Sequence, residues 1–196
     1  MSAPQEHDDD LNPSQTSGYK VTAKKTVDEY AKLDADDESL TRWKASLGIG
    51  AGGGGDAKFI VKSLFLTSPT LPPGRTISLD LTDPQALENV KKNPIVIKEG
   101  VEYSVGMKFV IENDVISGLR YLHVVKRAGI KVDKIDQMIG SYGPKAEQQS
   151  ATFITEESPE GMLARSGTYV VRSRITDDDQ HIHADFEWSF KLAKEW

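Results

Sequence analysis

The chain has 196 residues, which is enough for one domain of ordinary size together with an appended segment. It carries 24 Lys and Arg against 30 Asp and Glu, for a net charge of −6, and this balance argues against a dedicated nucleic-acid-binding protein, because phosphate contacts need basic residues. The sequence contains no cysteine, which excludes disulfides, thiolate metal sites and a cysteine nucleophile.

The first 55 residues are predicted to form a flexible arm. The opening stretch MSAPQEHDDDLNPSQTSGY is polar and acidic, so we expect it to be disordered in the free protein and not to act as a secretory signal. Thr26 and Glu29 have the spacing of a capping box and predict a short helix over about 27–33. Asp34 or Asp36 can cap a second helix over about 36–47, and the glycine-rich run at 48–55 predicts a hinge.

The second predicted helix has one apolar face. Leu40, Trp43 and Leu47 follow one another at intervals that place them on the same side. Because helices this short are marginal in water on their own, we expect this face to pack against something else.

Residues 56–196 are predicted to form an immunoglobulin-like antiparallel β-sandwich. Apolar and polar residues alternate in VEYSVGMKFVIE, which places Tyr103, Val105 and Phe109 on one face. Similar patterns predict strands at 58–67, 76–82, 94–98, 115–126, 130–139, 168–175 and 181–192. No apolar run is long enough to cross a bilayer, so we expect a cytoplasmic protein.

The stretch TDDDQHIHADFEWSF combines acids, histidines and aromatics. Alternation predicts that His181, His183 and Asp185 share a solvated face with Glu187, and that the other face points inward with Ile182, Ala184, Phe186, Trp188 and Phe190. The two histidines and Asp185 have the spacing of metal ligands on a strand, but exposed polar residues are the favoured interpretation, and no metal site is expected.

The inward aromatic row is typical of a sandwich core and equally suits an apolar ligand held between two sheets. The sequence shows no pairing of a nucleophile with a base, so neither catalytic residues nor an enzyme is expected.

Several segments of the sequence resemble the Rho GDP-dissociation inhibitors, especially their fungal members, and they follow the same order from about residue 19 to the C-terminus. These segments are DEYAKLDADDESLTRWKASLG, KEGVEY, VISGLRY, KVDKIDQMIGSYGPKAE, GMLARSGTY, SRITDDD and FEWSFKLAKEW. The resemblance implies a sandwich with a geranylgeranyl-binding cleft and an arm that folds onto a GTPase. It implies prenylated Rho-family GTPases in the GDP state as one-to-one partners, no cofactor, and only indirect membrane contact.

The resemblance also assigns roles by motif position. Contact with the GTPase switch regions is implied for Asp36, Asp37, Ser39, Leu40, Trp43 and Leu47. A prenyl pocket is implied for Leu66, Ile95, Tyr103, Phe109, Val115, Val171, Phe186 and Trp188. An acidic rim for the partner's basic C-terminal segment is implied for Asp133, Glu147, Glu156, Glu157, Asp177, Asp178 and Asp179.

The alternative is a carrier of other lipidated proteins on the same fold, similar to the phosphodiesterase-delta relatives. The arm discriminates between the two functions, because a pure lipid carrier does not need DADDESLTRW.

Overall fold

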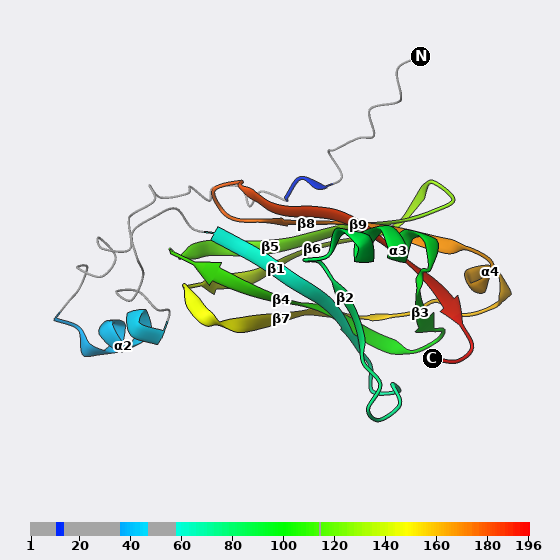
Figure 1. The fold of residues 1–196 in the computed structure, drawn as a ribbon, viewed down its shortest axis with the longest axis horizontal. Helices are drawn as coiled ribbons and strands as arrows, with labels where there is room; N and C mark the ends of the chain where they lie inside the picture. Colours follow the sequence, from blue (N-terminus) through cyan, green and yellow to red (C-terminus); the bar gives the residue numbers. More distant parts are fainter. Residues whose placement is uncertain (1–10, 14–35, 47–57, 114) are drawn as a thin grey trace, which may run out of the picture.

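The computed structural model describes residues 11–13, 36–46, 58–113 and 115–196, and within them two β-sheets pack face to face (Figure 1). The four-stranded sheet has the order β2-β1-β4-β7. Its strands are β1 (Lys58–Thr67), β2 (Ile77–Asp80), β4 (Glu102–Glu112) and β7 (Lys145–Glu157). The five-stranded sheet has the order β3-β9-β8-β5-β6. Its strands are β3 (Ile95–Lys98), β5 (Ile116–Arg127), β6 (Ile130–Tyr142), β8 (Thr168–Thr176) and β9 (Ile182–Ala193).

This architecture confirms the predicted β-sandwich, with one local difference in strand direction. Strand β3 pairs with β9 in parallel, because the chain passes from the edge of one sheet to the edge of the other through helix α3 (Pro84–Lys92). The core lies between the sheets. In β4 the predicted alternation is confirmed, since Val105, Met107, Phe109 and Ile111 are all buried on the inner face.

Helix α3 was not predicted, although its start carries a sequence signal. Asp83 accepts a hydrogen bond from the backbone N–H of Gln85 at 2.9 Å, and Pro84 occupies the first turn, where its missing N–H costs nothing. The helix lies against the outer face of β9, where the Ser189 hydroxyl donates to the Val90 carbonyl at 2.6 Å (Figure 1).

Strand β7 was also missed by the sequence pattern. Within its thirteen residues only Ala151 and Phe153 are buried, because β7 is an edge strand with little apolar surface to cover. A short helix, α4 (Met162–Arg165), follows it. None of the helices in the described ranges is long and apolar enough to span a membrane.

The described parts of the arm are residues 11–13 and 36–46, and the second range contains helix α2 (Glu38–Ser46). Leu11 lies in the stretch predicted to be disordered, yet it is 3% exposed and packs against Leu122 and Val124 on the outer face of β5. Helix α2 falls within the predicted helix over 36–47. The predicted helix over 27–33 and the predicted hinge at 48–55 lie outside the described residues.

Alternation fails at the start of β9, and the predicted placement of two residues there is wrong. Ile175 pairs with Ala184 and Thr176 pairs with Ile182, so His183 is an extra residue in a β-bulge. The His183 ring lies 5.4 Å from the Phe59 ring, and its side chain is only 11% exposed. Ile182, predicted to point inward, is 55% exposed.

Candidate functional site

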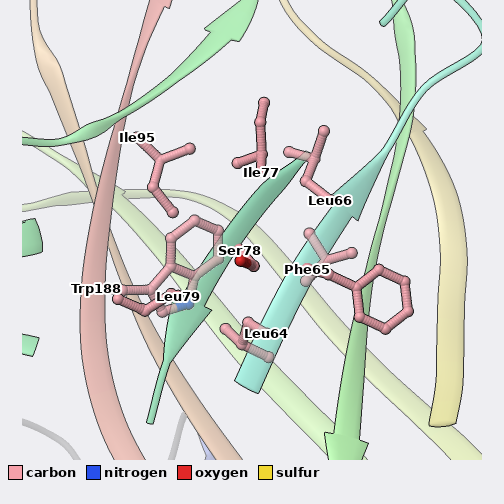
Figure 2. A pocket seen from close by; sticks show the side chains of 9 residues that line it. Leu64, Phe65, Leu66, Ile77, Ser78, Leu79, Ile95 and Trp188 are labelled. Atoms are coloured by element: carbon pink, nitrogen blue, oxygen red, sulfur yellow. The ribbon is translucent and has the colours of Figure 1, made fainter. Parts of the chain in front are cut away.

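An apolar hollow lies between the two sheets on the side of β2 and β3 (Figure 2). The pairing of β1 with β2 forms one wall of the hollow. Leu64 pairs with Leu79 and Leu66 pairs with Ile77, which brings neighbouring aliphatic side chains to one face. Strands of the other sheet supply the opposite wall. The lining residues are Leu64, Phe65, Leu66, Ile77, Ser78, Leu79, Ile95, Val105 and Trp188.

The hollow is closed in this structure. Its cavity volume is about 10 Å³, which corresponds to roughly one water molecule. Leu64, Leu66 and Trp188 are each at most 6% exposed, so these side chains fill the space themselves. Any larger ligand must push the walls apart.

Three of the residues expected in the prenyl pocket line this hollow, namely Leu66, Ile95 and Trp188. The other five lie elsewhere. Tyr103, Phe109 and Val171 are buried core residues, and Val115 is half-buried just before β5. Phe186 is half-buried and faces a shallow depression beside α3 that it shares with Leu87 and Asp185.

Several lining residues were not assigned to the pocket from the sequence: Leu64, Phe65, Ile77, Ser78 and Leu79. Leu64, Ile77 and Leu79 lie in strands that the sequence does predict, at alternate positions. The missing information was the pairing of β1 with β2, which places those positions on the same wall.

A buried chain of hydrogen bonds holds Trp188 from behind. The Trp188 indole N–H donates to Ser173 Oγ at 3.1 Å, and Ser173 Oγ is 2.9 Å from the Tyr121 hydroxyl. That hydroxyl in turn lies 3.3 Å from Nδ1 of His123. The orientation of the pocket tryptophan is therefore fixed by polar groups that cross the interior of the sandwich.

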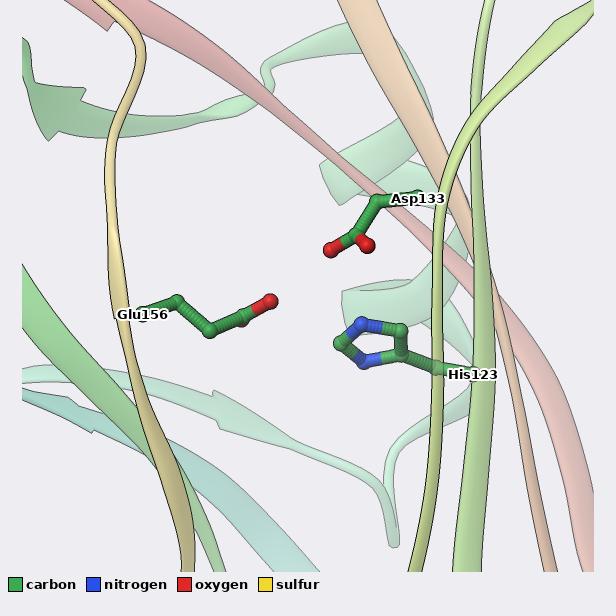
Figure 3. Close-up of side chains that lie close together, drawn as sticks. All are labelled: His123, Asp133 and Glu156. Atoms are coloured by element: carbon green, nitrogen blue, oxygen red, sulfur yellow. The ribbon is translucent and has the colours of Figure 1, made fainter.

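The acidic residues expected at one rim fall into separate groups. Asp133 and Glu156 lie beside His123 at the edge formed by β6 and β7 (Figure 3). Burial, the hydrogen bond to Asp133 and the negative charge of Asp133 together raise the pKa of Glu156 to about 7. Glu157 follows at the end of β7, and Glu147 lies near its beginning.

The residues Asp177 to Asp179 lie in the β8–β9 turn, farther along the sandwich. Thr176 pairs with Arg120, whereas Asp133 pairs with Val125. The five residues from Arg120 to Val125 correspond to roughly 17 Å along the strand. Asp178 fits closely over Gly118, where an added Cβ would lie 2.0 Å from its carboxyl carbon, and Asp179 is exposed.

Asp177 holds the two histidines that the sequence singled out. Its Oδ2 lies 2.8 Å from His183 Nε2 and 3.3 Å from His181 Nδ1. Burial alone would raise the pKa of Asp177, but the hydrogen bonds from the His183 ring and the His181 backbone outweigh it and lower that pKa. Asp185 pairs with Arg172 and Arg174 instead, so it does not join the histidines.

On helix α2 the capping residue is Asp37, not Asp34 or Asp36 as the sequence suggested. Asp37 Oδ1 accepts hydrogen bonds from the backbone N–H groups of Ser39 at 2.8 Å and Leu40 at 3.1 Å. Asp36 and Ser39 are exposed, and Leu40 is 37% exposed although it is apolar. The Trp43 side chain and Leu47 lie outside the described parts of the structure.

Comparison with known proteins identifies the family. Residues 4–195 match the family described as RHO protein GDP dissociation inhibitor. The Rho GDP-dissociation inhibitor of Schizosaccharomyces pombe is 42% identical over 174 residues, which are 88% of this chain and 84% of that protein. Rho GDP-dissociation inhibitor 1 of Rattus norvegicus is 42% identical over 181 residues, covering 91% of this chain and 86% of the relative.

A second fungal relative agrees with these matches. The Rho GDP-dissociation inhibitor of Saccharomyces cerevisiae is 38% identical over 185 residues, which cover 90% of each chain. Because relatives at this identity span nearly the whole chain, including most of the arm, this chain belongs to the Rho GDP-dissociation inhibitor family.

Proposed function

We propose that this protein binds prenylated Rho-family GTPases in the GDP state, one to one in the cytoplasm, slows GDP release and withdraws them from membranes. The observation that carries this proposal is the apolar hollow between the sheets, in a chain whose relatives are named as Rho GDP-dissociation inhibitors. The hollow receives the geranylgeranyl group, and the arm binds the switch regions.

The free energy of lipid transfer explains why such a hollow is needed. Each methylene moved out of water is worth about 0.8 kcal/mol, so a lipid of about twenty carbons requires roughly 16 kcal/mol of compensating apolar contact before it leaves a bilayer. The hollow is lined by aliphatic and aromatic side chains on both walls, which supply contact of that kind.

The position of the hollow lowers the free energy needed to separate the two sheets around it. It is bordered by β2 and β3, which have four residues each and lie at the edges of different sheets. No backbone ladder joins the two sheets on that side in the described part of the chain. Separating them there breaks side-chain contacts around Leu66, Ile95 and Trp188 and moves helix α3, which contacts both β2 and β9, but it leaves the central ladders intact.

The arm supplies the second contact in this proposal. Leu40 presents an apolar side chain on α2, and the Asp37 carboxylate stands at the start of the same helix. Packing of this face on the switch regions offsets the conformational entropy that ordering the arm costs. The full set that we propose for this contact is Asp36, Asp37, Ser39, Leu40, Trp43 and Leu47.

The acidic residues attract the basic segment that precedes the lipid. Asp133, Glu156 and Glu157 form one group, and Asp177 to Asp179 form another roughly 17 Å away along the strands. An extended segment of about five residues spans that distance at roughly 3.4 Å per residue. Contact of this protein with the membrane itself remains indirect.

The test is a liposome extraction assay with a geranylgeranylated, GDP-loaded Rho GTPase, in which GDP release is followed in parallel. We compare the full-length protein with residues 56–196. The full-length protein is expected to extract the GTPase and slow GDP release, and the shorter protein is expected to lose the effect on GDP release. If neither protein moves the GTPase into solution, the proposed cargo is wrong and other lipidated proteins become the candidates.

A further inference from the structure

A cluster of three polar side chains lies at the edge of the sandwich where β6 and β7 approach each other. This edge is opposite the one that holds the apolar hollow, and Figure 3 shows the three side chains. His123 comes from β5, Asp133 from β6 and Glu156 from β7. One ligand atom from each of the three side chains lies within 4.8 Å of the other two. Figure 3 shows the imidazole ring and both carboxyl groups facing a common space. These residues are far apart in the sequence, so no local motif predicts the cluster.

The histidine is the member that points to a ligand. His123 is 3% exposed, and its Nε2 has no hydrogen-bond partner among the described residues. A buried polar atom without a partner costs free energy, and native structures rarely leave one without a reason. Here the atom lies beside two carboxyl groups, which are themselves acceptors when ionised.

The groups behind His123 prepare it to act as a ligand. Nδ1 lies 3.3 Å from the Tyr121 hydroxyl, which is 2.9 Å from Ser173 Oγ. When Nδ1–H donates to that hydroxyl, the lone pair of Nε2 faces Asp133 and Glu156. Burial also lowers the pKa of His123 to about 4, so the imidazole is neutral at physiological pH. Metal-bound histidines are held by their other ring nitrogen in the same way.

We propose that in the free protein His123, Asp133 and Glu156 bind a divalent transition-metal ion, with Zn²⁺ as the first candidate and water in the remaining position. The ion and the partner's basic segment would compete for the carboxylates of Asp133 and Glu156. One imidazole nitrogen with carboxylate oxygens is a donor set that suits Zn²⁺, whereas Ca²⁺ and Mg²⁺ prefer oxygen ligands alone. Three protein ligands with one open position are common for zinc.

The geometry requires a modest adjustment. Zinc bonds of about 2.0–2.2 Å in a tetrahedron place ligand atoms roughly 3.4 Å apart, so ligand atoms that lie within 4.8 Å of one another need to approach by at most about 1.4 Å. Asp133 is exposed and can supply most of that movement, while His123 stays fixed in the core. The ion would link both sheets, because Glu156 belongs to the four-stranded sheet and the other two ligands to the five-stranded sheet.

The experiment is isothermal titration of the full-length protein with ZnCl₂ in a buffer that does not chelate metal, followed by the variants Asp133→Asn and His123→Gln. We expect one Zn²⁺ per chain, and an affinity weakened by roughly tenfold or more in each variant. Thermal melting with and without Zn²⁺ provides a second readout, because a ligand that binds only the folded state raises the midpoint. Asp133→Asn changes an exposed residue, so this variant separates loss of the ligand from loss of the fold.

The matched control is His181→Gln. It alters a second group, Asp177, Asp179 and His181, whose ligand atoms are also mutually close but which contains two exposed members. Unchanged affinity in His181→Gln, together with weakened affinity in Asp133→Asn, supports the site at His123. The proposal is overturned if the parent protein takes up no Zn²⁺, or if Asp133→Asn and His123→Gln both bind like the parent. The carboxyl groups of Asp133 and Glu156 would then be satisfied by a shared proton alone.

Discussion

At the scale of single residues, one carboxylate can serve two purposes. Asp37 caps α2 through Oδ1, which accepts both hydrogen bonds from the helix N-terminus. We also propose it for contact with the GTPase switch regions. A cap of this kind is worth about 0.5–2 kcal/mol of helix stability, so removing the side chain disturbs both the helix and the proposed contact.

A pair of substitutions separates these two effects. Asp37→Ala is expected to weaken the inhibition of GDP release by about tenfold or more, because cap and contact are both lost. Asp37→Ser keeps a good capping group but removes the charge. GDP release at limiting inhibitor is the measurement for both variants. If Asp37→Ser behaves like the parent, the charge of Asp37 makes no contact that matters and the residue acts through its helix.

Another residue-scale case is Asp185, which binds two arginines at once. Its oxygens lie 3.0 Å from Arg172 Nε and 2.7 Å from Arg174 Nη2, and the Arg174 side chain is 5% exposed. Burial works to raise the pKa of Asp185, but the hydrogen bonds and charges of the arginines outweigh it and lower that pKa. Because the folded-state pKa is depressed, the contribution to stability is present above the unfolded pKa of about 3.9 and is lost as the pH falls through the folded-state pKa.

The variant Asp185→Asn tests this pH dependence. At pH 7 we expect the free energy of unfolding to fall by about 2 kcal/mol, because Arg174 loses the partner of a buried charge. The difference between parent and variant should shrink as the pH is lowered from about 5 towards 2. Urea denaturation at several pH values measures it, with Glu187→Gln on the exposed neighbouring position as a control. A difference that stays constant across this range would contradict the assignment.

At the scale of secondary-structure elements, the success of sequence-based prediction depends on how many faces an element buries. Strand β4 buries one face, and its alternation is visible in the sequence. Edge strand β7 buries only Ala151 and Phe153, so its pattern is too weak to predict. Strand β5 presents Leu122 and Val124 on its outer face as well, and nothing local indicates that a residue from the arm covers them.

Leu11 in the arm covers this outer face of β5. Leu11 is 3% exposed against Leu122 and Val124. Leu11→Ala is expected to lower the free energy of unfolding by about 2 kcal/mol, because the variant loses the buried apolar surface of the leucine side chain and its contacts. Urea denaturation measures the effect, and Asn12→Ala, which changes an exposed neighbour, is the control. Equal stability of Leu11→Ala and the parent would mean that the contact contributes nothing in solution.

At the scale of the whole molecule, the sandwich combines continuous β-ladders with one side, between β2 and β3, where no ladder joins the two sheets in the described part of the chain. The sequence predicts two sheets and an inward aromatic strand, and the resemblance points to Leu66, Ile95 and Trp188 as lining residues. The sequence does not reveal which other residues line the hollow, because the lining depends on the pairing of β1 with β2 and on the distance between the two sheets. The cluster of His123, Asp133 and Glu156 escapes prediction for the same reason, since three strands from two sheets bring it together.

The hollow between the sheets is closed in this structure. A cavity of about 10 Å³ cannot hold a lipid of twenty carbons, so the lipid binding that we propose requires the β2 and β3 side to move outward. Ile95→Trp fills this space from a half-buried position and should compete with the lipid for it. We expect extraction of a geranylgeranylated GTPase from liposomes to fall by about tenfold or more, while GDP release from the same GTPase without its lipid stays inhibited as by the parent protein. The cost to folding should stay within about 1–3 kcal/mol, which thermal melting monitors.

Ile95→Val keeps the pocket apolar and should extract normally. If Ile95→Trp extracts as well as Ile95→Val, the lipid enters elsewhere, and the shallow depression beside Phe186 and α3 becomes the next surface to alter.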